Sequence, residues 1–413
     1  MTAAAPDTPL ADAPVQVSQR VSWAAWSIGF FCDSYSELFN IVVPLWALYL
    51  GYSPFEIGLL VGARSILSFL LAIHGGALVD RFGTKRVLVV LSAISAVNPL
   101  LFPALPWFPF LLALQMLGGL AGSLAWVSAQ ALALQVSNAD TTFMSRFAFF
   151  ARVGTTFAPA TIGVLWDQAG IWPSFIATSL WGSVFLVGAL LIPASAIAQD
   201  TKERERRVTL KSLMPRLSDY VGAFSLLAIP SVVFVVAVSF VRICSTNIQS
   251  SFYIVYLEQI DFPGTLIGTL ITIGSVCAGA GTLLAGTAER LMPPKWMYLI
   301  AVTLSIVFIT VTPLLGTWFP VLAVAIGLRG FFQGLSGPIM FTYLSRSVRP
   351  SEQGLSIGLR STANRLSVMV MPIMMGAAAE IFSVSVSFYI MGGLFLAMLA
   401  AIAIWLRGRG DMS

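Results

Sequence analysis

Charged side chains and histidine are scarce in this chain. Of its 413 residues only 10% are Asp, Glu, Lys or Arg, whereas a soluble globular domain carries about 25%. The single histidine, His74, cannot form a histidine-based metal site, and no Ser/His/Asp set, phosphate-binding loop or Cys-x-x-Cys pair is present. Acid–base and covalent catalysis therefore have few residues to use, so we expect no enzyme and no bound cofactor or metal.

Cysteine is also rare. The chain has three, Cys32, Cys244 and Cys277, and all of them lie inside apolar stretches rather than in loops. None of these positions suits a disulfide in an exposed loop. We therefore expect buried thiols that pack as small apolar side chains.

Apolar sequence, in contrast, is abundant, with 57% hydrophobic residues and a mean hydropathy of +0.88. A helix needs about 20 apolar residues to cross the hydrocarbon core of a bilayer. Twelve stretches are long enough: 22–50, 54–79, 87–105, 108–135, 143–166, 172–193, 230–257, 264–287, 296–315, 319–344, 354–378 and 384–406. The sequence therefore predicts an all-α membrane protein with twelve transmembrane helices that contacts the lipid bilayer directly.

The loops alternate in charge along the chain. Lys and Arg gather before segments 1 and 5, after segments 2, 6, 8 and 10, and at the C-terminus, while the alternate loops hold acidic residues and no Lys or Arg. This distribution follows the positive-inside rule, so we expect a multi-pass protein of the plasma membrane, a bacterial inner membrane, with both termini cytoplasmic. These loops and the arginines inside the segments explain the net charge of +5, so nucleic acid is not an expected partner.

The longest internal polar segment divides the chain into two halves. We expect residues 1–19, which are rich in Ala and Pro, to form a disordered cytoplasmic tail. Residues 20–193 and 230–406 are each predicted to form a six-helix bundle. A cytoplasmic loop over 194–229 joins the bundles, and residues 407–413 form a second cytoplasmic tail.

The two halves repeat each other. A separation of 209 residues relates two pairs of positions: Asp33 and Arg242, Pro54 and Pro263. In the later segments a separation of 213 residues relates four more pairs: Arg152 and Arg365, Pro159 and Pro372, Gly163 and Gly376, Asp167 and Glu380. Parallel half-repeats related by an axis along the membrane normal are typical of transporters.

One loop carries a specific motif. The run Gly76-Ala77-Leu78-Val79-Asp80-Arg81-Phe82-Gly83-Thr84-Lys85-Arg86 resembles the G-x-x-x-D-R-x-G-x-K/R-K/R signature of the major facilitator superfamily, and a decayed copy, Glu289-Arg290, follows segment 8. The resemblance, which extends over nearly the whole chain, implies two pseudo-symmetric six-helix bundles and transport by alternating access. It also implies a conformational latch made of Gly76, Asp80, Arg81, Gly83, Lys85, Arg86, Glu289 and Arg290. Alternatively, the basic residues of this loop only fix the topology.

Seven charged residues lie at mid-membrane depth: Asp33, Glu37, Arg64, Arg152, Arg242, Arg329 and Arg365. A central arginine costs about 2.5–3.5 kcal/mol to insert, so these arginines must face protein, water or a ligand rather than lipid. In the family that the chain resembles, segments 1, 4, 7 and 10 line the central cavity and segments 2, 5, 8 and 11 form the contact between halves. All seven charges fall on segments of these two groups, so the sequence predicts a positively charged interior that receives an anionic solute.

A polar stripe on segment 1 suggests proton coupling. Asp33, Glu37 and Asn40 are spaced i, i+4, i+7, so they lie on one face of the helix, and the matching stripe on segment 7 begins at Arg242. We hypothesise that Asp33 or Glu37 is a protonatable partner of Arg242. Binding of a proton would free the guanidinium for the anion, which couples the two solutes as a symport. A fixed structural ion pair is the alternative.

The interior arginines divide into two groups. Arg152 and Arg365 occupy matched positions in the two halves, and because a solute is asymmetric we expect them to serve structure or gating. Arg64, Arg242 and Arg329 have no basic counterpart, so they are the first candidates for the anion, to which a planar guanidinium donates two parallel hydrogen bonds. The complete set of expected solute contacts is Arg64, Arg242, Arg329, Gln333, Gln249, Asn40 and Trp126.

The sequence thus favours a secondary active transporter of a small organic anion that is coupled to protons and acts as a monomer. Two alternatives stay open. A proton-driven efflux antiporter for hydrophobic drugs would suit the acidic residues of segment 1, but buried arginines would repel a cationic drug. A receptor or scaffold that keeps the fold would show no flux for any solute. Counterflow with organic anions and drug-resistance assays distinguish the three.

Overall fold

A computed structural model of the chain describes residues 17–71, 83–137, 140–193, 229–347 and 353–408. Over these residues the chain is almost entirely helical and contains no strand. The predicted all-α class is therefore confirmed.

Six helices form the N-terminal bundle. They are α1 (Gln19–Tyr49), α2 (Pro54–Leu70), α4 (Thr84–Ala104), α5 (Phe108–Val136), α6 (Thr141–Ala169) and α7 (Ile171–Leu191). The start of α2 shows how the sequence fixes a helix end. The Ser53 hydroxyl accepts a hydrogen bond from the backbone N–H of Glu56, whose carboxylate accepts one from the backbone N–H of Ser53 at 2.9 Å. Pro54 takes the first helical position, where no N–H is needed.

The C-terminal bundle repeats this plan. Its helices are α10 (Pro230–Gln249), α11 (Phe252–Gln259), α12 (Gly264–Ala288), α13 (Pro294–Thr310), α14 (Phe319–Ser347), α15 (Gln353–Ile381) and α16 (Val384–Arg407), with a 3-10 turn, η4 (Thr312–Leu315), after α13. A break at Ser250 and Ser251 separates α10 from α11, which together make one span. The helices of both bundles coincide with the twelve predicted segments.

Eight spans within the described residues are long and apolar enough to cross a membrane by length and composition alone. Two of the longest helices, α1 and α15, are not among them. Each carries charged residues inside an apolar sequence, which lowers its mean hydropathy: Asp33 and Glu37 on α1, Arg360 and Arg365 on α15. Each of these two helices thus carries two of the charges of the interior, whereas α6, α10 and α14, which are among the eight spans, carry one each.

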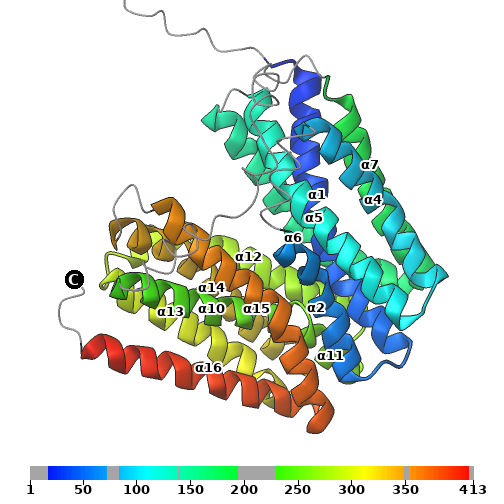
Figure 1. Cartoon of the computed structure of the whole chain (residues 1–413). Helices are drawn as coiled ribbons and strands as arrows, with labels where there is room; N and C mark the ends of the chain where they lie inside the picture. Colours follow the sequence, from blue (N-terminus) through cyan, green and yellow to red (C-terminus); the bar gives the residue numbers. More distant parts are fainter. Residues whose placement is uncertain (1–16, 72–82, 138–139, 194–228, 348–352, 409–413) are drawn as a thin grey trace, which may run out of the picture.

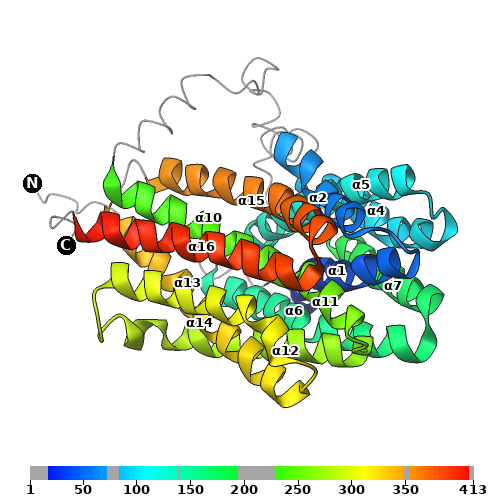
Figure 2. The same ribbon diagram turned by 90° about the horizontal axis from the view of Figure 1, so that it is seen from below.

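Two helix pairs join the bundles. α2 packs against α15, and α6 packs against α12, while α4 and α7 lie together in one bundle and α13 and α16 in the other. These are the segments predicted to form the contact between halves. Figures 1 and 2 show the bundles as two groups, blue to green for the N-terminal one and green to red for the C-terminal one, whose helices diverge from the contact region.

Glycine allows this contact to be very close. A Cβ added at Gly58 of α2 would collide with the backbone carbonyl of Pro372 in α15, and one added at Gly268 of α12 would collide with that of Pro159 in α6. Backbone therefore meets backbone in both pairs, as small residues permit between membrane helices.

Among the described residues, the apolar core that contains side chains of both bundles lies toward one end. The larger core contains most of the C-terminal bundle together with N-terminal residues such as Phe39, Phe102 and Phe175, near the ends of α1 and α4 and the start of α7. A second core, around Phe147 and Phe185, fills the opposite end of the N-terminal bundle alone. The bundles are closed at the end of the acidic loops, which we call the acidic-loop end, and are held apart at the other.

A candidate charged site between the bundles

The charges of the N-terminal bundle lie on three neighbouring helices. Asp33 and Glu37 are half-buried on one face of α1, as their spacing predicted. Asp33 interacts electrostatically with Arg152 of α6. Glu37 interacts with Asp33, with Arg64 of α2 and with Asn40, one turn further along α1.

Arg64 is anchored to the polar face of α1. Its guanidinium donates to the Asn40 side-chain oxygen at 3.2 Å and to the backbone oxygen of Ser36 at 3.4 Å. The guanidinium carbon also lies 5.7 Å from the centroid of the Phe39 ring. Gly119 of α5 accommodates the backbone of Arg64, because a Cβ there would meet the Arg64 carbonyl. The structure thus brings Arg64, Asn40 and Glu37 together.

Arginine also holds the C-terminal bundle together. Arg329 of α14 is only 1% exposed, and it donates to the side-chain oxygen of Gln249 and to the backbone oxygen of Ser245 at 3.0 Å, both on α10. Gln333, one turn further along α14, donates to the Thr246 hydroxyl at 2.6 Å. Arg329, Gln333 and Gln249 therefore form a polar ladder between α14 and α10. A solute could contact Arg329 only after displacing these partners, so its role in this conformation is positioning.

The hypothesised pairing of Arg242 with a carboxylate of α1 is not formed in this structure. Arg242 is half-buried on α10 and interacts with the Tyr298 hydroxyl of α13 and with Arg360 of α15. Asp33 and Glu37 instead have Arg152 and Arg64 as their cationic neighbours. The pairing was inferred from pseudo-symmetry, which relates the positions of two helices but does not fix how far apart the bundles stand.

Arg360 is a charged residue that the sequence interpretation missed. It lies within α15, with its guanidinium carbon 4.8 Å from the centroid of the Phe341 ring and a nitrogen 3.7 Å from the sulfur of Met340. It lies inside the predicted segment 354–378 but was not counted among the charges at mid-membrane depth. The signal that could have found it is the repeat, because the matched position, Phe147, is apolar and Arg360 therefore has no basic counterpart.

The matched arginines act differently in the two bundles. Arg365 of α15 donates to the backbone oxygen of Ser68 in α2 at 3.2 Å, so it bridges the bundles. Arg152 is exposed on α6 and lies near Asp33 of its own bundle. Trp126, expected in the site, stacks on Phe147 with ring centroids 5.8 Å apart and belongs to the core of the N-terminal bundle.

Two carboxylates cap helices across the interface at the acidic-loop end. Asp167, near the end of α6, accepts hydrogen bonds from the backbone N–H groups of Gly264 at 2.8 Å and Thr265 at 2.6 Å, at the start of α12. Glu380, near the end of α15, accepts one from the backbone N–H of Phe55 at 3.2 Å, at the start of α2. An anionic side chain is stabilised at a helix N-terminus by the unpaired N–H groups and the helix dipole. Because Asp167 and Glu380 occupy matched positions in the repeat, each bundle provides one cap for a helix of the other bundle.

The predicted latch is described only in part. Gly76, Asp80 and Arg81 lie outside the described residues, as does His74. Gly83 precedes α4 with a φ of 83°, a conformation that glycine adopts without strain. The remaining members lie at helix ends: Lys85 and Arg86 in the first turn of α4, Glu289 and Arg290 at the end of α12. The latch therefore stays a prediction.

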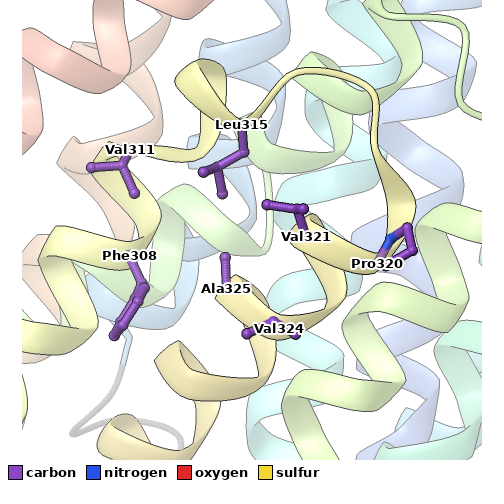
Figure 3. A pocket seen from close by; sticks show the side chains of 7 residues that line it. All are labelled: Phe308, Val311, Leu315, Pro320, Val321, Val324 and Ala325. Carbon is purple, nitrogen blue, oxygen red and sulfur yellow. The ribbon is translucent and has the colours of Figure 1, made fainter.

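An apolar pocket of about 400 Å³ lies apart from these charges, between α13 and the start of α14. Its lining consists of Phe308, Val311, Leu315, Pro320, Val321, Val324 and Ala325 (Figure 3). No charged side chain lines it, and Val324 is exposed on the outer surface of the bundle. This pocket cannot serve the charged site.

Comparison with known proteins was made for sequence and for structure. The sequence profile of the Major Facilitator Superfamily matches residues 25–244 and 235–411. The crystal structure of a mutant of the nucleoside transporter NupG is similar with a TM-score of 0.79 at 13% identity, covering 93% of this chain and 99% of that one. A POT family transporter in complex with a thioalcohol-conjugated peptide is similar with a TM-score of 0.70 at 10% identity, covering 94% and 96%. At these identities the structural likeness shows the fold.

Proposed function

Because this chain belongs to the major facilitator superfamily, we propose that it is a secondary active transporter that moves a small organic anion across the membrane by alternating access. One observation carries the choice of an anion. Among residues more than five positions from either end of a described helix, six arginines face two carboxylates: Arg64, Arg152, Arg242, Arg329, Arg360 and Arg365 against Asp33 and Glu37.

The excess of positive charge needs a counter-charge. Arg329 is almost fully buried, and the described residues offer it hydrogen-bond acceptors without charge. A charge taken out of water is costly unless an opposite charge or a ligand compensates it. An anionic solute that enters between the bundles supplies that compensation, whereas a cationic solute adds to the repulsion.

Proton coupling is the second part of the proposal. Asp33 has Arg152 and Glu37 has Arg64 as a cationic neighbour in the conformation described here. When either carboxylate takes up a proton, its arginine loses its counter-charge and becomes available to an anion. Proton and anion then favour each other's binding, which is the requirement for symport.

The orientation follows from the loop charges. The bundles are closed at the acidic-loop end, where Asp167 and Glu380 cap helices of the opposite bundle. By the positive-inside rule this end faces away from the cytoplasm. On that basis the structure represents an inward-facing conformation, with both termini cytoplasmic in a bacterial inner membrane.

The test begins with a screen for ligands. Purified full-length protein is heated with a panel of organic anions, because a ligand that binds the native state raises the melting temperature. Ligands found in this way are then followed in counterflow across proteoliposomes. We expect counterflow with one or more organic anions, and no gain of resistance to cationic hydrophobic drugs in a sensitive host. Drug resistance without anion counterflow would contradict the proposal.

A further inference from the structure

Three arginines of the C-terminal bundle form a cluster without a carboxylate. They are Arg242 on α10, Arg329 on α14 and Arg360 on α15, which we call the arginine triad. Arg242 interacts electrostatically with both of the others. The acidic residues of this bundle in the described part of the chain lie at helix ends and in loops: Glu258, Asp261, Glu289 and Glu380. None of the triad forms an ion pair with a described carboxylate.

The triad is also short of hydrogen-bond acceptors. The Nε atom of each of the three guanidinium groups is buried and has no partner. The hydroxyl of Tyr253, which interacts with Arg329, is likewise buried without a partner. Buried donors are nearly always satisfied in native proteins, so a shared deficit at three neighbouring arginines points to a missing acceptor.

Two of the three arginines, Arg242 and Arg360, lie close to the same side chains. Ser239 of α10, one turn before Arg242, lies 3.0 Å from the Tyr298 hydroxyl and 3.0 Å from the Met340 sulfur. Arg360 contacts the same Met340 sulfur from α15 and stacks on Phe341. Arg242 and Arg360 are thus presented from different helices towards one region, and both are partly exposed.

Arg329 has a different part in the triad. Two of its nitrogens are engaged with Gln249 and Ser245, and its side chain is enclosed. Arg329 therefore adds positive charge near Arg242 and Arg360, but it does not compete with them for hydrogen bonds to a ligand. We assign it as a positioning residue rather than as a direct contact.

Resting on the proposed function, we propose that the arginine triad is a subsite for a compact group with two negative charges, of the kind presented by a phosphate monoester. Arg242 and Arg360 donate to its oxygens, while Arg329 contributes charge. Two guanidinium forks that converge on one group need three or four acceptor positions, which a tetrahedral dianion presents. A monocarboxylate supplies one charge and leaves at least two cations of the triad uncompensated.

The test uses pairs of probes that differ by one charge. Phenyl phosphate is compared with methyl phenyl phosphate, and methyl phosphate with dimethyl phosphate, at pH 8, where a phosphate monoester is a dianion because its second pKa is about 6. The readout is the concentration of each probe that raises the melting temperature of the purified full-length protein by the same fixed amount, because equal shifts correspond to equal ratios of ligand concentration to Kd. We expect the dianion of each pair to act at a concentration at least about tenfold lower, which corresponds to about one decade in Kd.

Arg360→Gln tests the triad directly. This variant should lower the preference for the dianion about tenfold, by weakening the dianion far more than the monoanion. Arg360→Lys keeps the charge without the fork and should retain an intermediate preference. Arg346→Gln removes the same charge from the exposed end of α14, outside the triad, and should leave the preference unchanged. The melting temperature without ligand shows whether each variant is folded.

The failure of this inference and that of the proposed function give different results. If monoanions stabilise the protein as well as dianions do, or if Arg360→Gln weakens both members of a pair equally, the dianion subsite is wrong while anion transport stands. If no anion of either charge stabilises the protein or is transported, both proposals fall together.

Discussion

The two bundles arise from one repeat, yet they differ in how they treat buried charge. In the N-terminal bundle two arginines have two carboxylates as neighbours, Arg152 with Asp33 and Arg64 with Glu37. In the C-terminal bundle the arginine triad has only uncharged partners among the described residues. In the N-terminal bundle, where each arginine has a carboxylate beside it, a carboxylate can bind or release a proton without a ligand. In the C-terminal bundle, the arginines need an anion to balance their charge. Under the proposed function, this difference assigns proton binding to the N-terminal bundle and solute binding to the C-terminal bundle.

At the acidic-loop end the same bundles stay alike. Asp167 and Glu380 occupy matched positions, and each caps a helix of the opposite bundle. Matched prolines also stand at the starts of the helices they cap: Pro54 is the first residue of α2, and Pro263 is the N-cap of α12. Symmetry is thus kept where the bundles contact each other, and it is lost among the charged residues that we propose to bind the solute.

Loss of Arg242 should have the largest effect on transport. Arg242→Gln removes a charged hydrogen-bond donor that contributes about 3 kcal/mol, so anion counterflow should fall about 100-fold. Counterflow in proteoliposomes measures this effect. Arg346→Gln, at the exposed end of α14, is the matched control and should transport nearly as the parent does. Equal losses of counterflow in both variants would contradict a specific role of the C-terminal bundle in binding the anion.

Neutralising the carboxylates of α1 should affect coupling rather than exchange. Asp33→Asn or Glu37→Gln should abolish accumulation driven by a pH gradient, which for one proton and one pH unit is worth about tenfold. Exchange of anion for anion should continue, because the arginine triad is intact. Uptake with an imposed gradient is compared with counterflow, and Asp261→Asn, an exposed residue in the loop before α12, serves as the control. A variant that still accumulates anion would assign proton binding to another group.

The caps at the acidic-loop end should differ in strength. Asp167 accepts two hydrogen bonds at a helix whose N-cap, Pro263, has no side-chain cap, whereas Glu380 accepts one at a helix already capped by Ser53. Asp167→Asn should therefore shift the conformational equilibrium by about 1 kcal/mol, about fivefold, and Glu380→Gln by less.

Pulsed electron paramagnetic resonance can measure this shift. Spin labels at Tyr49→Cys and Phe382→Cys, both exposed, report the distance between the bundles at this end. More of the long-distance population is expected in Asp167→Asn than in Glu380→Gln. A larger long-distance population in Glu380→Gln than in Asp167→Asn would contradict this prediction. It would show that the Ser53 cap of α2 does not reduce the contribution of Glu380 to the closed state.

The smallest effect should come from the helix cap within the N-terminal bundle. Ser53→Ala removes the capping box of α2 and should cost about 0.5 kcal/mol, at the low end for such caps because Glu380 still binds the Phe55 N–H. A drop of about 1 °C in the melting temperature is expected for a chain of this size. Transport by the folded protein should be unchanged, and a large loss of transport would assign this cap to the moving part of the cycle.

Much of this molecule could be predicted from local sequence. The twelve spans follow from apolar length, and the polar face of α1 follows from the i, i+4 spacing of Asp33 and Glu37. Arg360 was missed although it lies inside the predicted segment 354–378, because only the charges nearer the middle of each segment were counted. The partners of Asp33 and Glu37 could not be predicted, because they depend on how the bundles are separated in a given conformation.

A structure determined with a bound organic anion would test the central claim most directly. The account predicts that the anion lies between the bundles with its charged group against Arg242 and Arg360, and with Arg329 still bound to Gln249 behind them. An anion held only by Arg64 and Arg152 of the N-terminal bundle, with the arginine triad in contact with protein acceptors alone, would contradict it.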